Sequence, residues 1–318
     1  MSSNQFWTRR SYRPQSGETY GPYRIEELIV ETKFSILYSS TFLQDGSKKA
    51  IKFIKCLKGK EERVKNEVEI MKRIDHPNLL KLEYSSIRDP YMIIVTNYAP
   101  FENLSRFMGK YYPSGMPSRI AQYVLLQMVS AIAYLHNLGI WHRDIKPQNF
   151  LVFNNDKDKP YVVLADFGLA KQYQKCETDN SLAGTKKYMA PEIINNQRYT
   201  NAVDIWALGV TFFFMMTNQE AFETPSSDSM TRENEKIEKM IKNGYLNYDL
   251  INEQKDLPEI IGLIKRMCEV IPSKRITAKE LQKHPWLVGN SKNGEERAIS
   301  SLVGMGYSDE FDDAIPSV

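Results

Sequence analysis

The chain has 318 residues, of which 42% are hydrophobic and 25% charged, and its formal net charge is +3. This length and composition indicate a soluble globular protein with a large buried core, and the small net charge argues against a nucleic-acid or membrane-surface partner. No run of 18 apolar residues is present, and residues 1–17 lack the apolar core of a secretory signal.

The first part of the chain has mostly strand character. β-Branched and aromatic residues predict strands over residues 23–55 and again over 79–98. Between these stretches, residues 60–74 have the periodicity of an amphipathic helix. Its expected apolar face consists of Val64, Val68, Met71 and Ile74.

The second part of the chain has mostly helical character. Residues 118–138 carry the strongest helical pattern, with one apolar stripe. That stripe consists of Val124, Met128, Ala131 and Leu135. Further helices are expected at 201–217, 231–243, 257–269 and 277–282. The change of character near residues 97–103 predicts two lobes, and the joint between two lobes is a natural place for a ligand cleft.

The segment Trp141–Leu151 concentrates polar side chains that carry chemistry. Asp144, Lys146 and Asn149 lie within six positions, on a loop after the strongest helix. A carboxylate there can orient a hydroxyl and accept its proton, and an amide oxygen can bind a hard cation. Asp166 supplies a second carboxylate, in Leu164-Ala-Asp-Phe-Gly168. Two further motifs follow, Gly184-Thr185 and Ala190-Pro-Glu192.

These motifs, in this order, resemble the eukaryotic protein kinase family. The resemblance covers roughly residues 23–287 and implies an α+β bilobal fold, with a small β-rich N-lobe and a larger helical C-lobe. The expected boundaries are a flexible N-terminal tail at 1–20, an N-lobe at 21–97, a C-lobe at 98–287 and a C-terminal tail at 288–318.

The resemblance also implies the cofactors and the catalytic roles. Asp144 corresponds to the catalytic base, and Lys146 to the partner of the γ-phosphate of ATP. Asn149 and Asp166 correspond to the ligands of Mg²⁺. Lys146 and Gly184-Thr185 resemble the branch of the family that phosphorylates serine and threonine in proteins.

A second set of residues is implied for ATP binding. Lys52, in Lys49-Ala-Ile-Lys52, resembles the lysine that holds the α- and β-phosphates, and Glu67 resembles the helix glutamate that pairs with it. We choose Glu67 over Glu69 because it stands nine residues before His76-Pro-Asn78. The other expected ATP-site residues are Val30, Leu37, Ala50, Thr96, Asn97, Ala99 and Leu151.

Structural roles can be assigned from the same resemblance. They comprise His142 packed against Phe167, Asp204 and Trp206 on a buried helix that braces the catalytic loop, and Arg275 as the buried partner of Glu192.

The glycine clamp of the family is missing. The three clamp positions fall at Val30, Thr32 and Ser35, within a stretch that contains no glycine. A side chain there crowds the approach of backbone N–H groups to phosphate, and a required positive φ would cost ~1 kcal/mol or more. We expect an active kinase with weaker ATP handling. The alternative is a pseudokinase scaffold that binds partners without catalysis.

Substrate choice is expected to depart from a preference for arginine upstream of the target residue. The three positions that usually carry the recognising carboxylates are Asn103, Gln148 and Phe214 in this chain. Without those charges the preference loses its Coulombic basis. Glu102, next to Asn103, is an alternative source of charge.

Control by phosphorylation is expected in residues 169–185. Arg143 precedes the base, a position that marks this control in the family, and a phosphate in the segment can pair with it. The candidates are Ser181, which we prefer, and Thr178, modified by an upstream kinase or by trans-autophosphorylation. An unmodified loop is the alternative. Thr185 is expected to hydrogen-bond Asp144 and Lys146 rather than to act as the switch.

The last expectations concern subgroup, tail and compartment. Met189–Glu192 and His284–Trp286 resemble calmodulin-dependent, AMP-activated-related and autophagy-initiating kinases. Residues 296–307 resemble the first helix and turn of a ubiquitin-associated domain, so ubiquitin is one candidate partner and an intramolecular contact with the large lobe is another. The scattered cysteines (Cys56, Cys176 and Cys268) indicate a reducing, cytoplasmic compartment.

Overall fold

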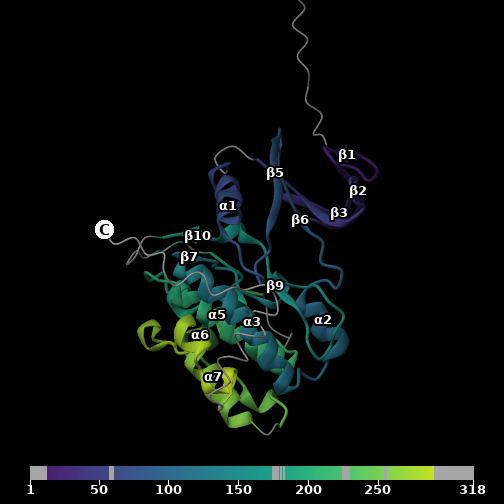
Figure 1. The fold of residues 1–318 in the computed structure, drawn as a ribbon. Helices are drawn as coiled ribbons and strands as arrows, with labels where there is room; N and C mark the ends of the chain where they lie inside the picture. Colours follow the sequence, from purple (N-terminus) through teal and green to yellow (C-terminus); the bar gives the residue numbers. More distant parts are fainter. Residues whose placement is uncertain are drawn as a thin grey trace, which may run out of the picture. The chain divides into compact units, whose positions relative to one another are not determined.

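The computed structural model describes residues 13–56, 61–173, 179, 181, 183–223, 230–253 and 256–289. The chain divides into two compact units, one of residues 1–64 and 82–98 and the other of residues 65–81 and 99–318. Strands dominate the first unit and helices the second (Figure 1). The expected α+β organisation, with a β-rich N-terminal part and a helical C-terminal part, is confirmed.

The first unit contains an antiparallel sheet. Within the described residues it has six strands in the order β1-β2-β3-β4-β6-β5. Their bounds are Thr19–Tyr20, Tyr23–Glu31, Ser35–Phe42, Lys48–Lys55, Leu82–Arg88 for β5 and Tyr91–Asn97 for β6. Strands were expected over 23–55 and 79–98, and both expectations are confirmed. The sheet begins at Thr19, just before the predicted start of the lobe.

An aromatic cluster fills the core of the first unit. Phe53 on β4 is fully buried, and the rings of Tyr20, Tyr38 and Tyr91 contact it edge to face at centroid distances of 4.9, 6.2 and 6.0 Å. Side chains alternate between the two faces of a strand, so Ile51 and Phe53 point into this core while Ala50 and Lys52 lie on the opposite face. The register of the sheet therefore separates its packing face from its other face.

The second unit is built around two long buried helices. Helix α3 (Ser118–Asn137) buries the whole predicted stripe, and α5 (Ala202–Thr217) is buried along almost its entire length. Gly209 lets α5 approach α7 (Leu257–Met267), because a Cβ at this position would lie 2.6 Å from Cys268 Sγ. Among the described residues, no helix has the length and apolar character needed to cross a membrane.

The other predicted helices also form, with ends within two residues of expectation. They are α1 (Glu61–Arg73), α6 (Met230–Lys242) and α8 (Ala278–Gln282). The expected apolar face of α1 is buried at all four positions. Three short helices were not predicted, namely α2 (Leu104–Tyr111), α4 (Pro191–Ile194) and α9 (Pro285–Val288).

Short elements place the polar loops of the second unit. Strand β7 (Ile140–Trp141) pairs with β10 (Lys171–Gln172), and β8 (Phe150–Val152) pairs with β9 (Val162–Leu164). Single 3₁₀ turns follow, η1 (Pro147–Asn149), η2 (Phe167–Leu169) and η3 (Lys186–Tyr188), with η4 (Tyr248–Leu250) and η5 (Pro272–Lys274) further on. These pairings bring together loops that are separated in sequence.

Candidate active site

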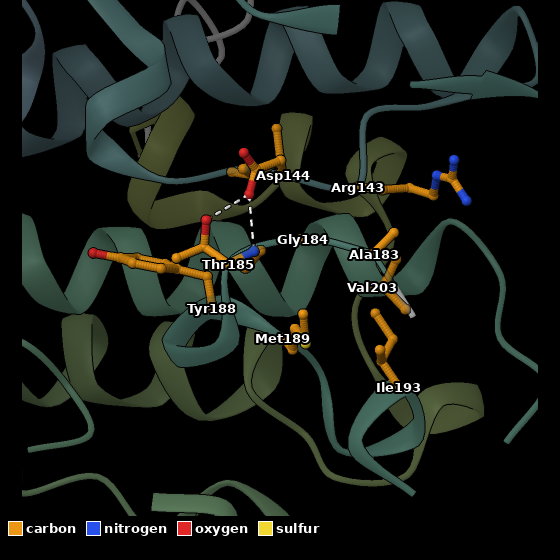
Figure 2. Close-up of a pocket in the computed structure, with 11 residues that line it drawn as sticks. Arg143, Asp144, Ala183, Gly184, Thr185, Tyr188, Met189, Ile193 and Val203 are labelled. Atoms are coloured by element: carbon orange, nitrogen blue, oxygen red, sulfur yellow. Dashed lines mark hydrogen bonds between the residues drawn. The ribbon is translucent and has the colours of Figure 1, made fainter. Parts of the chain in front are cut away.

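The carboxylate of Asp144 is held by donors on both oxygens. Its Oδ2 accepts from Lys146 Nζ at 2.6 Å and from Asn149 Nδ2 at 3.1 Å. Its Oδ1 accepts from the backbone N–H and the hydroxyl of Thr185, at 2.9 and 2.8 Å (Figure 2). Lys146 Nζ also donates to Thr185 Oγ1 at 2.7 Å. Asp144 and Lys146 are thus fixed in one network, and the expected hydrogen bonds of Thr185 with both are confirmed.

Asp204 on α5 fixes the backbone of the loop that carries Asp144. Its Oδ1 accepts from Arg143 N at 2.8 Å and its Oδ2 from His142 N at 2.9 Å, with His136 Nε2 also 2.9 Å from Oδ2. Burial alone would raise the pKa of Asp204, but its interaction with His136 and the hydrogen bond from the Arg143 N–H outweigh burial and lower it. Asp204 therefore braces the loop as a carboxylate, as the family resemblance implied.

A close backbone contact joins this loop to the Gly184-Thr185 motif. Gly184 has a φ of 106°, and a Cβ there would lie 2.6 Å from the carbonyl oxygen of Arg143. Only glycine combines this φ with this approach. Gly184 and Asp144 also line a small cavity, together with Tyr188 and Met189 (Figure 2). The glycine of this motif thus lets Thr185 reach the carboxylate of Asp144.

Asn149 directly precedes β8, and Asp166 comes shortly after its antiparallel partner β9. Asn149 Nδ2 donates to Asp144 O at 2.7 Å, and Ala165 N donates to Asn149 O at 2.8 Å. Since the amide nitrogen of Asn149 faces Asp144, its Oδ1 is the atom that can bind a cation. An amide oxygen and the exposed carboxylate of Asp166 suit Mg²⁺, which binds through few protein oxygens and the phosphates of its substrate. This donor set fits the implied metal.

Glu67 lies close to Asp166 and Gly168. It is 5% exposed on α1, and a Cβ on Gly168 would lie 3.2 Å from Glu67 Oε2 and 3.3 Å from Asp166 Oδ1. The neighbouring Asn66 donates from Nδ2 to Ala170 O at 2.8 Å. Helix α1 is therefore held against the segment that follows Asp166, and the absence of a side chain at Gly168 leaves room for both carboxylates.

The sequence matches the model of the protein kinase domain family over residues 23–287. The chain belongs to the protein kinase family. Curated relatives include calcium/calmodulin-dependent protein kinase type 1 of Macrobrachium nipponense, 31% identical over 86% of this chain and 77% of the relative. The serine/threonine-protein kinase ULK3 of Xenopus laevis is 30% identical over 83% of the chain and 56% of the relative. The serine/threonine-protein kinase PLK4 of Drosophila grimshawi is 28% identical over 95% of the chain and 38% of the relative.

These relatives place the kinase in the serine/threonine branch, as its motifs predicted. The predicted likeness to calmodulin-dependent kinases is in keeping with the first name. The chain spans little more than half of ULK3 and less than half of PLK4.

Most of the expected ATP-site residues of the kinase lie on one face of the sheet. Leu37 pairs with Val30 on one side and with Lys52 on the other, and Ala50 pairs with Thr96. Directly paired residues share a face, so these five side chains lie opposite the aromatic core. Asn97 ends β6, whereas Ala99 and Leu151 belong to the second unit with Glu67. That these residues form one ATP site stays a prediction.

The clamp loop closes its turn with the hydroxyl of Thr32. Thr32 Oγ1 accepts from Phe34 N at 3.2 Å and from Ser35 N at 3.0 Å, and Thr32 N donates to Ser35 O at 2.8 Å. The three clamp positions, Val30, Thr32 and Ser35, all have a negative φ. The backbone strain that a positive φ would cause therefore does not arise. The loop differs from a glycine clamp in another way. The backbone N–H groups of Phe34 and Ser35, at the tip of the loop, donate to the side chain of Thr32.

The assigned structural residues occupy their expected places in the kinase. The ring of His142 packs edge to face against Phe167, with 5.4 Å between the centroids. Arg275 forms two hydrogen bonds with Glu192, at 2.7 and 3.0 Å. The contact of His136 with Asp204 was not predicted, because a histidine near the end of a helix has no local pattern that marks a distant carboxylate.

Ser181, which was predicted to be a regulatory site, lies beside Arg143. Its Nη1 donates to Ser181 Oγ at 2.9 Å and to Asp179 Oδ2 at 2.8 Å. Ser181 is therefore beside the expected arginine, while Thr178 lies outside the described residues. The sequence analysis missed Asp179. Its only local signal was a carboxylate two positions before Ser181, and polar loops contain many of those.

Proposed function

We propose that the chain transfers the γ-phosphate of ATP to serine or threonine hydroxyls of protein substrates. The observation that carries the proposal is the network on Asp144, in which Lys146, Asn149 and Thr185 hold a carboxylate and an ammonium together. Transfer in this family depends mainly on positioning and on neutralising charge, and this network supplies both.

In the proposed reaction the substrate hydroxyl oxygen forms a bond to the γ-phosphorus while the bond from that phosphorus to the β–γ bridging oxygen breaks. Asp144 orients the hydroxyl and receives its proton. Lys146, 2.6 Å from Asp144, also neutralises charge on the phosphoryl group in transfer. Asn149 and Asp166 would hold Mg²⁺, which supplies a positive charge at the phosphates.

On the ATP side, we assign Lys52 to the α- and β-phosphates and Glu67 to the pairing that orients it. Val30, Leu37, Ala50 and Thr96 share the face of the sheet on which Lys52 lies, so this face would contact the nucleotide. We assign the backbone near Asn97 and Ala99 to the adenine, and Leu151 to the nucleotide as well. Because Thr32 bonds the N–H groups at the tip of the clamp, we expect weak binding of the phosphates by this loop.

Regulation is assigned to the segment that contains Ser181. Phosphorylation there, by an upstream kinase or in trans, would place a second anion beside Asp179 and Arg143, so we propose that it modulates activity. A comparison of wild type with Ser181→Ala after incubation with MgATP tests this. Equal activity and an equal phosphate count by intact mass would exclude Ser181 as the site. The cytoplasmic location stays a proposal, as does a partner for the C-terminal tail, whose residues 290–318 lie outside those described.

The deciding experiment measures phosphate transfer from MgATP to a generic serine/threonine substrate. Asp144→Asn and Lys52→Met should each abolish transfer, while Asp158→Asn, the same change at an exposed aspartate, should leave it unchanged. If wild type whose segment 169–185 is confirmed to be phosphorylated transfers nothing at millimolar ATP, the proposal fails. A pseudokinase scaffold would then be favoured. In such a scaffold the backbone N–H groups of the clamp would bond Thr32 rather than phosphate.

A further inference from the structure

Arg143 is a nearly buried cation, with a side chain that is 10% exposed. Its Nε donates to Leu169 O at 2.8 Å, and its Nη1 lies 3.3 Å from the hydroxyl oxygens of Tyr173 and Tyr199. These neutral partners satisfy hydrogen bonds but do not balance a charge. A buried guanidinium is strongly destabilising without an anion. The site therefore requires a negative charge next to Arg143.

Asp179 supplies that charge. Its side chain is 8% exposed, and its Oδ2 accepts from Arg143 Nη1 at 2.8 Å and from the hydroxyl of Tyr173. Lys171 Nζ lies 3.7 Å from the same oxygen, and Ser181 N donates to Oδ1 at 2.8 Å. One carboxylate thus pairs with two cations, Arg143 and Lys171.

The backbone of Asp179 is fixed independently of its side chain. Its N–H donates to Tyr199 O at 3.1 Å, and Tyr199 N donates back to Asp179 O at 2.8 Å, which forms an isolated β-bridge. The carboxylate is therefore presented to Arg143 from a defined position.

Arg143 transmits this contact to the catalytic base. Arg143 adopts a φ of 67°, and its backbone N–H donates to Asp204. Its carbonyl oxygen lies so close to Gly184 that a Cβ at position 184 would clash with it. Asp144 is the next residue, and Thr185, which follows Gly184, bonds to it. The anion that holds the guanidinium therefore also fixes Arg143, a strained residue that directly precedes the base and lies against the glycine before Thr185.

We propose that Asp179 is a positioning residue that takes the place of an activating phosphate. In the unmodified chain it holds Arg143, and through Arg143 it holds Asp144, so transfer does not require prior phosphorylation of residues 169–185. This inference rests on the proposed kinase activity. A phosphate on Ser181 would carry up to two negative charges into a site already balanced by Asp179, which explains a modulating effect better than a switch.

The test uses full-length protein produced with a co-expressed phosphatase and shown to be phosphate-free by intact mass. Initial rates in the first turnovers give kcat and the KM for ATP before the enzyme can modify itself. The phosphate-free wild type should be active, and Asp179→Asn should lower kcat at least tenfold. Asp179→Glu should recover part of the loss. Asp158→Asn is the matched control at an exposed position and should not change kcat.

A double-mutant cycle separates positioning from simple loss of structure. If Asp179 acts through Arg143, Arg143→Met with Asp179→Asn should lose no more than Arg143→Met alone, with similar melting temperatures. Additive losses, or an Asp179→Asn enzyme within twofold of wild type, would overturn the inference. So would a wild type that becomes active only after phosphorylation, although the proposed function would then stand. If no form is active, the proposed function itself has failed.

Discussion

Arg275 and Glu192 form a doubly hydrogen-bonded ion pair inside the second unit, with side chains 0% and 2% exposed. The guanidinium of Arg275 also donates to Ala202 O at the start of α5. Arg275, which stands 83 positions after Glu192, therefore ties the short helix α4 to the helix that carries Asp204. Removal of either charge would leave the other buried without a partner.

We expect Glu192→Gln to lower the free energy of unfolding by about 3–5 kcal/mol, because it isolates a buried guanidinium. Urea unfolding monitored by tryptophan fluorescence measures this change. Lys81→Gln is the matched control, since its pair with Asp75 is 65% and 81% exposed and should contribute little. A Glu192→Gln protein as stable as the control variant would contradict the prediction.

Thr32→Gly should lower the KM for ATP about fivefold, equivalent to ~1 kcal/mol, with little change in kcat. The substitution frees the N–H groups of Phe34 and Ser35 from the threonine hydroxyl and removes the Cβ. Steady-state kinetics over a range of ATP concentrations measure both constants. Thr32→Val separates the two causes, because it removes the hydroxyl and keeps the branched Cβ. An unchanged KM in Thr32→Gly would show that the clamp does not limit ATP binding.

A peptide library should show no dominant preference for arginine three positions upstream of the target residue. Asn103 caps α2 through a bond from Arg106 N at 3.1 Å, and Phe214 is buried in α5. Glu102 pairs with Arg106 at 3.0 Å, so its charge is already compensated within the chain. Arg106→Ala should therefore raise the preference for upstream arginine. The prediction would be wrong if arginine led the profile of the unaltered kinase.

Stability should fall as the pH is lowered from about 6.5 towards 4. Burial lowers the pKa of His76 to about 4, and its ring contacts Asn78 N and Ser130 Oγ, both at 3.0 Å. Between these pH values the unfolded state binds a proton that the folded state does not. The free energy of unfolding therefore decreases as the pH falls. The contribution is complete above pH 6.5 and lost near pH 4.

The pH prediction is checked by the difference in unfolding free energy between wild type and His76→Gln, measured from pH 7.5 to 4.5. Other titrating groups are common to both proteins and cancel in this difference. The advantage of wild type should shrink as the pH falls. A difference that does not vary with pH would show that His76 is not buried in its neutral form.

The long elements and the catalytic motifs could be predicted because their information is local. The stripe on α3 repeats every three to four residues, and Asp144, Lys146 and Asn149 lie within one short segment. Helix α2 was missed because it is short, although Leu104, Phe107 and Met108 have helical spacing. The family resemblance supplied what spacing could not, such as the pairing of Glu192 with Arg275.

The sequence by itself determined which catalytic groups the chain possesses and which family arranges them. The tertiary structure decided which partners those groups have. Asp179 is 36 positions from Arg143, and no period or spacing links a loop carboxylate to that guanidinium. Thr32 reads as a lost glycine in the sequence, yet its hydroxyl binds the tip of its own turn. The contact of Asp179 with Arg143 depends on burial and on a fold that brings distant segments together, whereas that of Thr32 depends on the conformation of its turn, and both exist only after the chain has folded.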